Sequence, residues 1–141
     1  FAPSINGHQI FLNCYICGDI DFIFGSATAT FESCVIESLP CSSGYITAAS
    51  TPEGQEQGYL FNNCHFIGNA SPNSVFLGRP WRNHAKTIIQ NSYLGAHIHP
   101  QGWHNWNKVE AQDTLYYAEI NNHGPGATLS NRPLWVKKTT C

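Results

Sequence analysis

The sequence contains no methionine, few charged residues and no long apolar run. Because a complete translation product begins with Met, we expect the chain to be a processed product or an interior piece of a longer protein. Charged residues make up only 11% of the chain, compared with roughly 25% in ordinary soluble domains. A helical bundle needs charged outer faces, so this composition argues against one. The 13 Asn and 12 Gly residues instead indicate many turns between short strands.

Several classes of function are also excluded. The formal net charge is −2, and the only adjacent cations are Lys137 and Lys138, whereas a nucleic-acid binder carries a basic patch. No apolar segment approaches the roughly 20 residues of a membrane span. The Gly-x-Ser-x-Gly turn of serine esterases and the glycine-rich phosphate loops are absent. We therefore expect neither a nucleic-acid partner nor a membrane partner.

The six cysteines do not form a recognisable metal site. Cys14 and Cys17 have the C-x-x-C spacing of redox and zinc sites, but no second pair completes a ligand set. In an extended strand these two side chains would point to opposite faces. We predict no metal; a disulfide framework is possible in a secreted protein. The alternative is that Cys14, Cys34 and Cys64 are small buried apolar residues.

A six-residue pattern recurs along the chain at residues 11–16, 31–36, 61–66 and, more loosely, 89–94. Each copy begins with a large apolar residue, has Asn or Ser at its third position and Cys or Ser at its fourth, and ends with a large apolar residue. The intervals between copies are 20, 30 and 28 residues, which is typical of repeat architectures. The inward positions shift phase once, at the Asn or Ser. Asn tolerates the left-handed conformation, so this position predicts a corner between two strands.

Repeated strand–corner–strand units predict an all-β fold, a right-handed parallel β-helix, in one domain over residues 1–141. A β-sandwich is the alternative. In the β-helix, equivalent residues of successive turns form two inner columns, and neighbouring turns lie about 4.8 Å apart. The first contains Phe11, Phe31, Phe61 and Ile89, and the second contains Cys14, Cys34, Cys64 and Ser92. Segments 40–44, 52–58, 69–73 and 100–102 are predicted as loops between strands, and no substantial helix is expected.

Residues 18–25, Gly-Asp-Ile-Asp-Phe-Ile-Phe-Gly, carry two carboxylates in an apolar run. Strand alternation predicts Asp19 and Asp21 on one face and Ile20, Phe22 and Phe24 on the other. Two close carboxylates can divide the roles of acid and base or nucleophile, and a glycosidase pair is one such arrangement. Alternatively, one or both aspartates cap a turn.

Residues 77–81, Leu-Gly-Arg-Pro-Trp, add a cation and an aromatic ring beside a rigid proline. The Arg79 fork can orient a carboxylate with two hydrogen bonds, and the Trp81 face can stack on a sugar ring. Trp103 and Trp106, with His104 between them, could line a groove or pack in the interior.

Together, residues 18–25 and 77–81 resemble the two main signatures of the pectin methylesterase family. Further similarity lies in residues 44–50, 102–106 and 116–127, in the family's order and most like its bacterial members. The resemblance implies a parallel β-helix, of which this chain is a partial domain incomplete at both ends. It also implies hydrolysis of galacturonate methyl esters in pectin, with no cofactor, by a secreted protein. By the same resemblance Asp21 is the nucleophile, Arg79 orients it, Trp81 binds the substrate sugar, and Ile20 and Phe24 line the cleft.

One departure from the family pattern concerns the acid. The family has a Gln-Asp-Thr motif before the nucleophile strand, which supplies the acid and an oxyanion donor, and no match precedes Asp21. Gln112-Asp113-Thr114 has the right letters but leads into a late segment, so we do not assign the acid role to Asp113. Losing one oxyanion donor can lower the rate roughly 100- to 1000-fold. We therefore expect this chain alone to be a poor esterase, and a non-catalytic pectin-binding β-helix is the alternative function.

Overall fold

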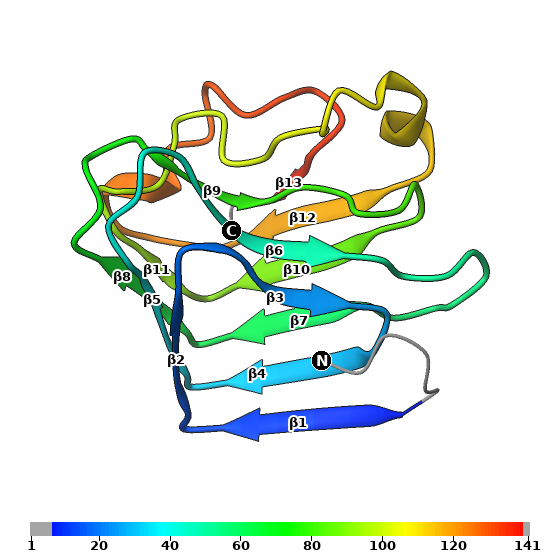
Figure 1. The fold of residues 1–141 in the computed structure, drawn as a ribbon, viewed down its shortest axis with the longest axis horizontal. Coiled ribbons are helices and arrows are strands. Elements are labelled where there is room, and N and C mark those ends of the chain that lie inside the picture. The colour runs from blue at the N-terminus through cyan, green and yellow to red at the C-terminus, as the bar shows by residue number, and fades with distance from the viewer. Residues whose placement is uncertain (1–6, 140–141) are drawn as a thin grey trace.

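The computed structural model describes residues 7–139 as short strands wound in successive turns (Figure 1). The strands are β1 (His8–Leu12), β2 (Tyr15–Gly18), β3 (Ile20–Gly25), β4 (Thr28–Glu32), β5 (Val35–Ser38), β6 (Gly44–Ala49), β7 (Tyr59–Asn62), β8 (His65–Gly68), β9 (Val75–Gly78), β10 (Lys86–Gln90), β11 (Tyr93–Leu94), β12 (Tyr116–Ile120) and β13 (Lys137–Thr139). Within the described range, the only helical segments are two short 3-10 turns, η1 (Val109–Asp113) and η2 (Pro125–Ala127). The predicted all-β composition is confirmed.

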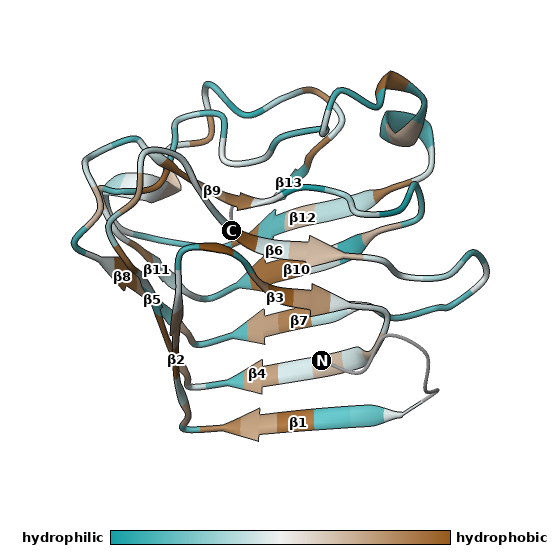
Figure 2. Ribbon diagram, in the orientation of Figure 1, coloured by the Kyte–Doolittle hydropathy of each residue, from teal (hydrophilic) through white to brown (hydrophobic). Residues whose placement is uncertain are grey.

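The strands form three parallel sheets, in the orders β1-β4-β7-β10-β12-β13, β11-β8-β5-β2 and β3-β6-β9. Each of the first three turns of the chain contributes one strand to each sheet, so every third strand pairs with its counterpart in the next turn. This is a parallel β-helix, as the repeat predicted, and the β-sandwich alternative is wrong. Loops project between the sheets, and the long loop after β6 is neutral to hydrophilic (Figure 2). None of the helical segments in residues 7–139 has the length and apolarity of a membrane span.

The corner between the first and second sheets is left-handed in each turn. Asn13, Ser33, Asn63 and Asn91, the third residues of the four pattern copies, have φ values of 54°, 54°, 52° and 50°. Asn121 provides a fifth such corner, with φ of 54°. The phase shift in the pattern therefore marks the bend of the chain, as predicted.

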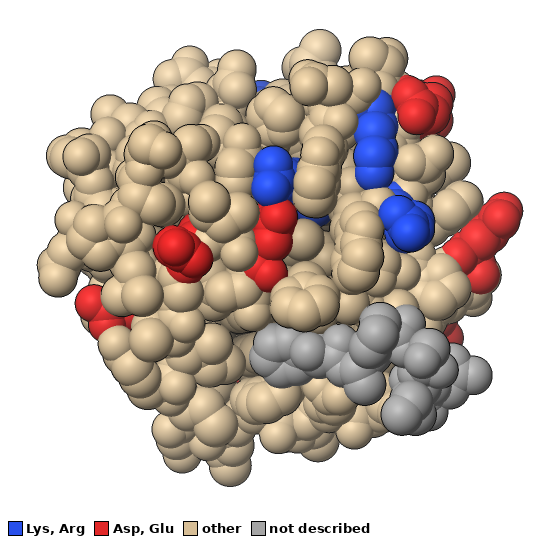
Figure 3. Space-filling model, viewed as in Figure 1, with Lys and Arg blue, Asp and Glu red and all other residues tan. Residues whose placement is uncertain are grey.

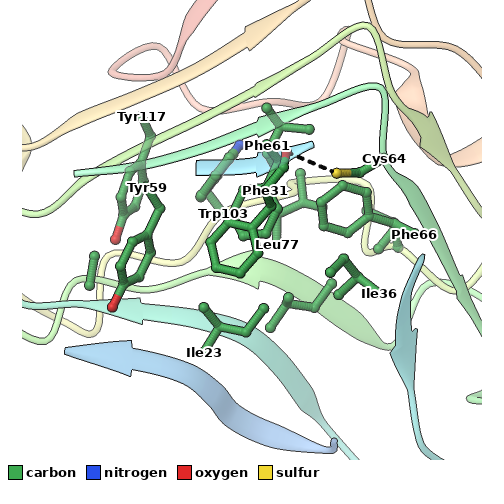
Figure 4. Close-up of a cluster of buried hydrophobic side chains, with 14 of the residues drawn as sticks. Ile23, Phe31, Ile36, Tyr59, Phe61, Cys64, Phe66, Leu77, Trp103 and Tyr117 are labelled. Atoms are coloured by element: carbon green, nitrogen blue, oxygen red, sulfur yellow. Dashed lines mark hydrogen bonds between the residues drawn. The ribbon is translucent and has the colours of Figure 1, made fainter. Parts of the chain in front are cut away.

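The first inner column is a stack of aromatic rings. Phe11, Phe31 and Phe61 are register partners across β1, β4 and β7, and Ile89 continues the column. The ring centroids are 4.9 Å apart for Phe11 and Phe31 and 4.3 Å apart for Phe31 and Phe61, with nearly parallel planes. Such offset stacking adds to the burial of apolar area, so the column stabilises successive turns against one another (Figure 4).

The second inner column contains the thiols. Cys34 and Cys64 are completely buried, and the Cys64 thiol donates to the Phe31 carbonyl at 3.4 Å (Figure 4). Ser92 continues the column, accepting from the Cys64 amide at 3.0 Å and donating to the Gln90 carbonyl at 2.7 Å. The cysteines at positions 14, 17, 34, 41 and 64 are free, and Cys141 lies outside the described residues. The buried-apolar interpretation of Cys34 and Cys64 is therefore correct.

A buried ion pair continues the aromatic column. Glu119 is the register partner of Ile89 and is only 1% exposed. Its carboxylate accepts from Arg132 Nε at 2.6 Å and Nη2 at 3.1 Å, and from Trp103 Nε1 at 2.8 Å. This pair joins the segment after η2 to β12, and nothing in the sequence pattern predicted it.

Candidate active site

One depression with a carboxylate in its lining lies over the sheet β3-β6-β9. It has a volume of about 240 Å³ and is lined by Asp21, Phe24, Ala48, Trp81 and Trp106. A larger depression of about 350 Å³ crosses the sheet that contains β4, β7 and β10. The ammonium group of Lys86, on the wall of that depression, already donates to the Gln55 and Glu56 carbonyls. We therefore take the first depression as the candidate site.

Asp21 is aimed by an irregularity in β3. Its φ is 52°, a left-handed value, and the register of β3 against β6 shifts between Ile20 and Ile23. The shift breaks the period of two. Ile20 is 49% exposed and Phe24 is 42% exposed, whereas Ile23 is completely buried.

The alternation predicted for this strand is therefore wrong. It placed Ile20 and Phe24 on the inner face, but both side chains are on the outside, because the bulge at Asp21 changes which residues face the core. Phe22 is partly buried against the core. Phe24 lines the depression, while Ile20 is exposed on the same strand and is not among the lining residues.

Arg79 binds the Asp21 carboxylate through both oxygens. Nε is 3.0 Å from Oδ1 and Nη2 is 2.7 Å from Oδ2. The two side chains are 18% and 22% exposed. Parallel hydrogen bonds of this kind fix the orientation of a carboxylate and are stronger than hydrogen bonds between neutral groups. The segments 18–25 and 77–81, which are far apart in the sequence, thus meet at one ion pair.

Aromatic rings surround this pair. Trp81 packs edge-to-face against Phe24, with ring centroids 5.9 Å apart. Trp106 and Tyr45 each lie 3.8 Å, centroid to Cζ, from the Arg79 guanidinium. The sequence had suggested Trp106 only as one possible groove residue, and it had missed Tyr45. Tyr45 lies on β6, the strand that pairs with the strand of Asp21, and this position was the signal that could have identified it.

The other candidate side chains lie elsewhere. Trp103 is buried in the core (Figure 4), stacked on Tyr117 with ring centroids 4.3 Å apart. Asp19 is exposed, and its carboxylate accepts from the Ile20 amide at 2.8 Å, which is the local capping alternative. Asp113 is exposed in η1. Neither aspartate lines the depression, so Asp21 is the only carboxylate among its lining residues.

Burial, followed by neighbouring arginine charges, lowers the pKa values of two basic groups near the site. Burial and then the Arg79 charge lower the pKa of His104. Burial, followed by the charge of Arg82, lowers the pKa of Lys108, whose ammonium group donates to the Pro80 and Trp81 carbonyls at 3.1 and 2.8 Å. Charged side chains are sparse on the face shown in Figure 3. In residues 7–139 no group of three or more His, Cys, Asp or Glu side chains is arranged to hold a metal ion.

Comparison with known proteins identifies a family for these features. The family model described as Pectinesterase matches residues 4–140. Probable pectinesterase 29 of Arabidopsis thaliana is 40% identical over 141 residues, covering 96% of this chain and 41% of that protein. The structure of pectin methylesterase from carrot superposes with a TM-score of 0.86 at 32% identity, over 96% of this chain and 46% of that one. A pectin methylesterase solved in complex with hexasaccharide VII gives a TM-score of 0.74 at 27% identity, over 93% of this chain and 46% of that one.

The chain thus spans less than half the length of the relatives that it matches. The Arabidopsis thaliana and carrot proteins come from plants, whereas the motifs had suggested a likeness to bacterial members. The likeness to bacterial members stays a prediction.

Proposed function

Because the chain belongs to the pectinesterase family, we propose that it carries the nucleophile half of an active site that hydrolyses galacturonate methyl esters in pectin. The observation that carries this proposal is the two-hydrogen-bond pair of Asp21 and Arg79 in an open depression beside Trp81. A carboxylate that an arginine orients through two hydrogen bonds is a competent nucleophile.

In the proposed reaction, an Asp21 oxygen attacks the ester carbonyl carbon of the substrate. The bond between that carbon and the methoxy oxygen breaks, and the leaving oxygen takes a proton from an acid to give methanol. The resulting acyl-enzyme is an anhydride, which water hydrolyses to the galacturonate carboxylate and the regenerated Asp21 carboxylate. Before the attack, Arg79 orients the Asp21 carboxylate through two hydrogen bonds.

The substrate sugar is assigned to the aromatic side of the depression. Trp81 is half-buried, Phe24 is exposed, and their rings pack edge-to-face. We assign substrate contact to Trp81 and Phe24, with Ile20 at the rim on the same strand. The polymer is a cell-wall component, which favours action outside the cell.

Apart from the nucleophile Asp21, no residue lining the depression has a side chain that can act as a general acid. We therefore propose that the 141-residue chain is a weak esterase by itself and that the remaining groups come from residues outside it. A non-catalytic pectin-binding function is the second candidate, favoured by this same incomplete set of groups.

The test is methanol release from methyl-esterified pectin, measured with this chain and with a chimera. In the chimera this chain replaces the matching segment of the carrot enzyme. We expect the chimera to release methanol, Asp21→Asn to lower its rate by at least about 1,000-fold, and the chain alone to show a small fraction of that rate.

Three results would contradict these assignments. A folded but inactive chimera that still binds pectin would favour the binding function. An active Asp21→Asn chimera would remove the nucleophile assignment. Shortened oligogalacturonides among the products would indicate cleavage of glycosidic bonds. The position of Asp19 outside the depression argues against that activity.

A further inference from the structure

The guanidinium of Arg79 is enclosed by two aromatic rings. Its Cζ atom lies 3.8 Å from the ring centroid of Tyr45 and 3.8 Å from that of Trp106. A ring centroid cannot lie in the guanidinium plane at that distance without a clash, so both rings lie over its faces. The Nε and Nη2 edge of the same group bonds Asp21. Cation–π contacts with two rings, together with the bonds to Asp21, therefore leave the plane of the guanidinium little freedom to rotate.

The Tyr45 ring is itself held in a stack along the sheet. It lies parallel to the Phe76 ring, with centroids 5.2 Å apart, and Phe76 stacks on His99 at 4.2 Å. Tyr45 and Phe76 are register partners on β6 and β9. One face of Tyr45 thus rests on a fixed neighbour while the other carries Arg79.

The Trp106 ring is held by a strained turn. Trp106 and Asn107 have φ values of 55° and 56°, which are unusual in consecutive residues other than glycine. The Trp106 amide donates to His104 Nδ1 at 2.9 Å, and the Asn107 amide donates to Asn105 Oδ1 at 2.9 Å. Such strain persists only where the surroundings determine it, and it is typical of functional sites.

Lys108 ties this turn back to the arginine segment. Its ammonium group donates to the carbonyls of Pro80 and Trp81, the two residues that follow Arg79, and lies 5.3 Å from the Trp106 ring centroid. The turn over residues 104–108 is therefore bonded to the two residues that follow Arg79. It also holds the Trp106 ring against the Arg79 guanidinium.

We propose that Tyr45 and Trp106 are positioning residues, which hold Arg79 in the plane that aims the Asp21 carboxylate. The geometric part of this proposal concerns the chain itself. Its catalytic consequence rests on the proposed esterase function, so the two parts are tested by separate measurements.

The first measurement is the side-chain Nε–Hε resonance of Arg79 in the ¹⁵N-labelled chain, assigned by its loss in Arg79→Lys. Ring currents shift protons that lie over an aromatic face upfield. We expect Tyr45→Leu and Trp106→Leu each to move this resonance downfield, and Tyr45→Phe to leave it in place. Arg82 is the matched control, because its Cζ lies 5.4 Å from the Trp81 ring and its resonance should not move.

The second measurement is pectin methyl ester hydrolysis by the chimera described above. Tyr45 does not line the depression, so Tyr45→Leu should lower kcat by about 10- to 100-fold with little change in KM, and Tyr45→Phe should restore it. The amide spectrum of each variant establishes that it is folded.

An Arg79 resonance that stays unmoved in both folded leucine variants would overturn the clamp, even if the chimera is active. A displaced resonance together with an unchanged kcat in an active chimera would overturn its catalytic role. An inactive chimera would count against the proposed function, and the resonance would still decide whether the clamp exists.

Discussion

Asp21 shows how one backbone conformation determines the candidate site. Its left-handed φ of 52° reverses the facing of the residues around it, so that Phe24 becomes exposed and Ile23 becomes buried. The same φ range occurs at the Asn and Ser corners, where the repeated pattern revealed it. Asp21 occurs once in the chain, in a run that reads as an ordinary strand. Its conformation could therefore not be predicted from the sequence alone.

This conformation predicts an inverted order of stability at position 21. Glycine in a strand is usually less stable than alanine by about 0.5–1 kcal/mol, whereas a left-handed φ costs an alanine about 1–2 kcal/mol. Asp21→Gly and Asp21→Ala both remove the carboxylate, so their difference isolates the backbone. We expect Asp21→Gly to be more stable by about 1 kcal/mol in urea unfolding. Asp19 is the control: it has no positive φ, so Asp19→Gly should be less stable than Asp19→Ala. If Asp21→Ala proves more stable than Asp21→Gly, the backbone conformation does not determine stability at position 21.

The strands and their columns were largely predictable, because each is repeated. Three copies of a pattern with one phase shift were enough to predict the corner, the Phe column and the Cys column. The fold depends on these repeated contacts between turns. Features that occur only once in the chain were not predicted. Glu119 stands in register with Ile89, and a carboxylate at an inner position contradicts the pattern until its partner Arg132 is known.

The buried pair of Glu119 and Arg132 predicts an asymmetric response to substitution. Arg132→Met leaves a buried carboxylate unpaired and should lower the free energy of unfolding by about 3–5 kcal/mol. The double variant Glu119→Gln/Arg132→Met removes that charge and keeps an acceptor for the Trp103 indole. We therefore expect the double variant to be more stable than Arg132→Met in urea or thermal unfolding. If the second substitution lowers stability further, the unpaired charge is not the cause of the loss.

At the scale of the whole molecule, three histidines are concentrated in one stretch of chain over the sheet β3-β6-β9. Burial lowers the pKa of His97, whose Nε2 has no hydrogen-bond partner within the described residues. Burial also lowers the pKa values of His99 and His104, with Arg132 acting further on His99 and Arg79 on His104. The fold therefore holds all three imidazoles neutral under conditions in which an unfolded chain would protonate them.

This arrangement predicts a loss of stability on mild acidification. The unfolded state binds protons near the ordinary histidine pKa of 6.5 and the folded state binds them only at lower pH, so stability rises with pH in this range. The contribution is fully present above pH 6.5 and is lost as the pH falls through the lowered pKa values. The amides of Asn62 and Asn63 lower the pKa of Glu32, which adds a second, separate loss below its ordinary value of 4.5.

The melting temperature measured between pH 7.5 and 4 should therefore fall in two stages. His97→Gln removes the most buried of the three titrations and should make the first stage shallower. His8→Gln is the matched control, because His8 is exposed on β1, and it should leave the profile unchanged. A melting temperature that stays constant from pH 7 to 5, or a first stage unaltered in His97→Gln, would show that this histidine does not couple the fold to pH. Since His104 Nδ1 accepts from the Trp106 amide and protonation of the imidazole removes this acceptor, we expect the Arg79 resonance to lose ring-current shift as His104 becomes protonated.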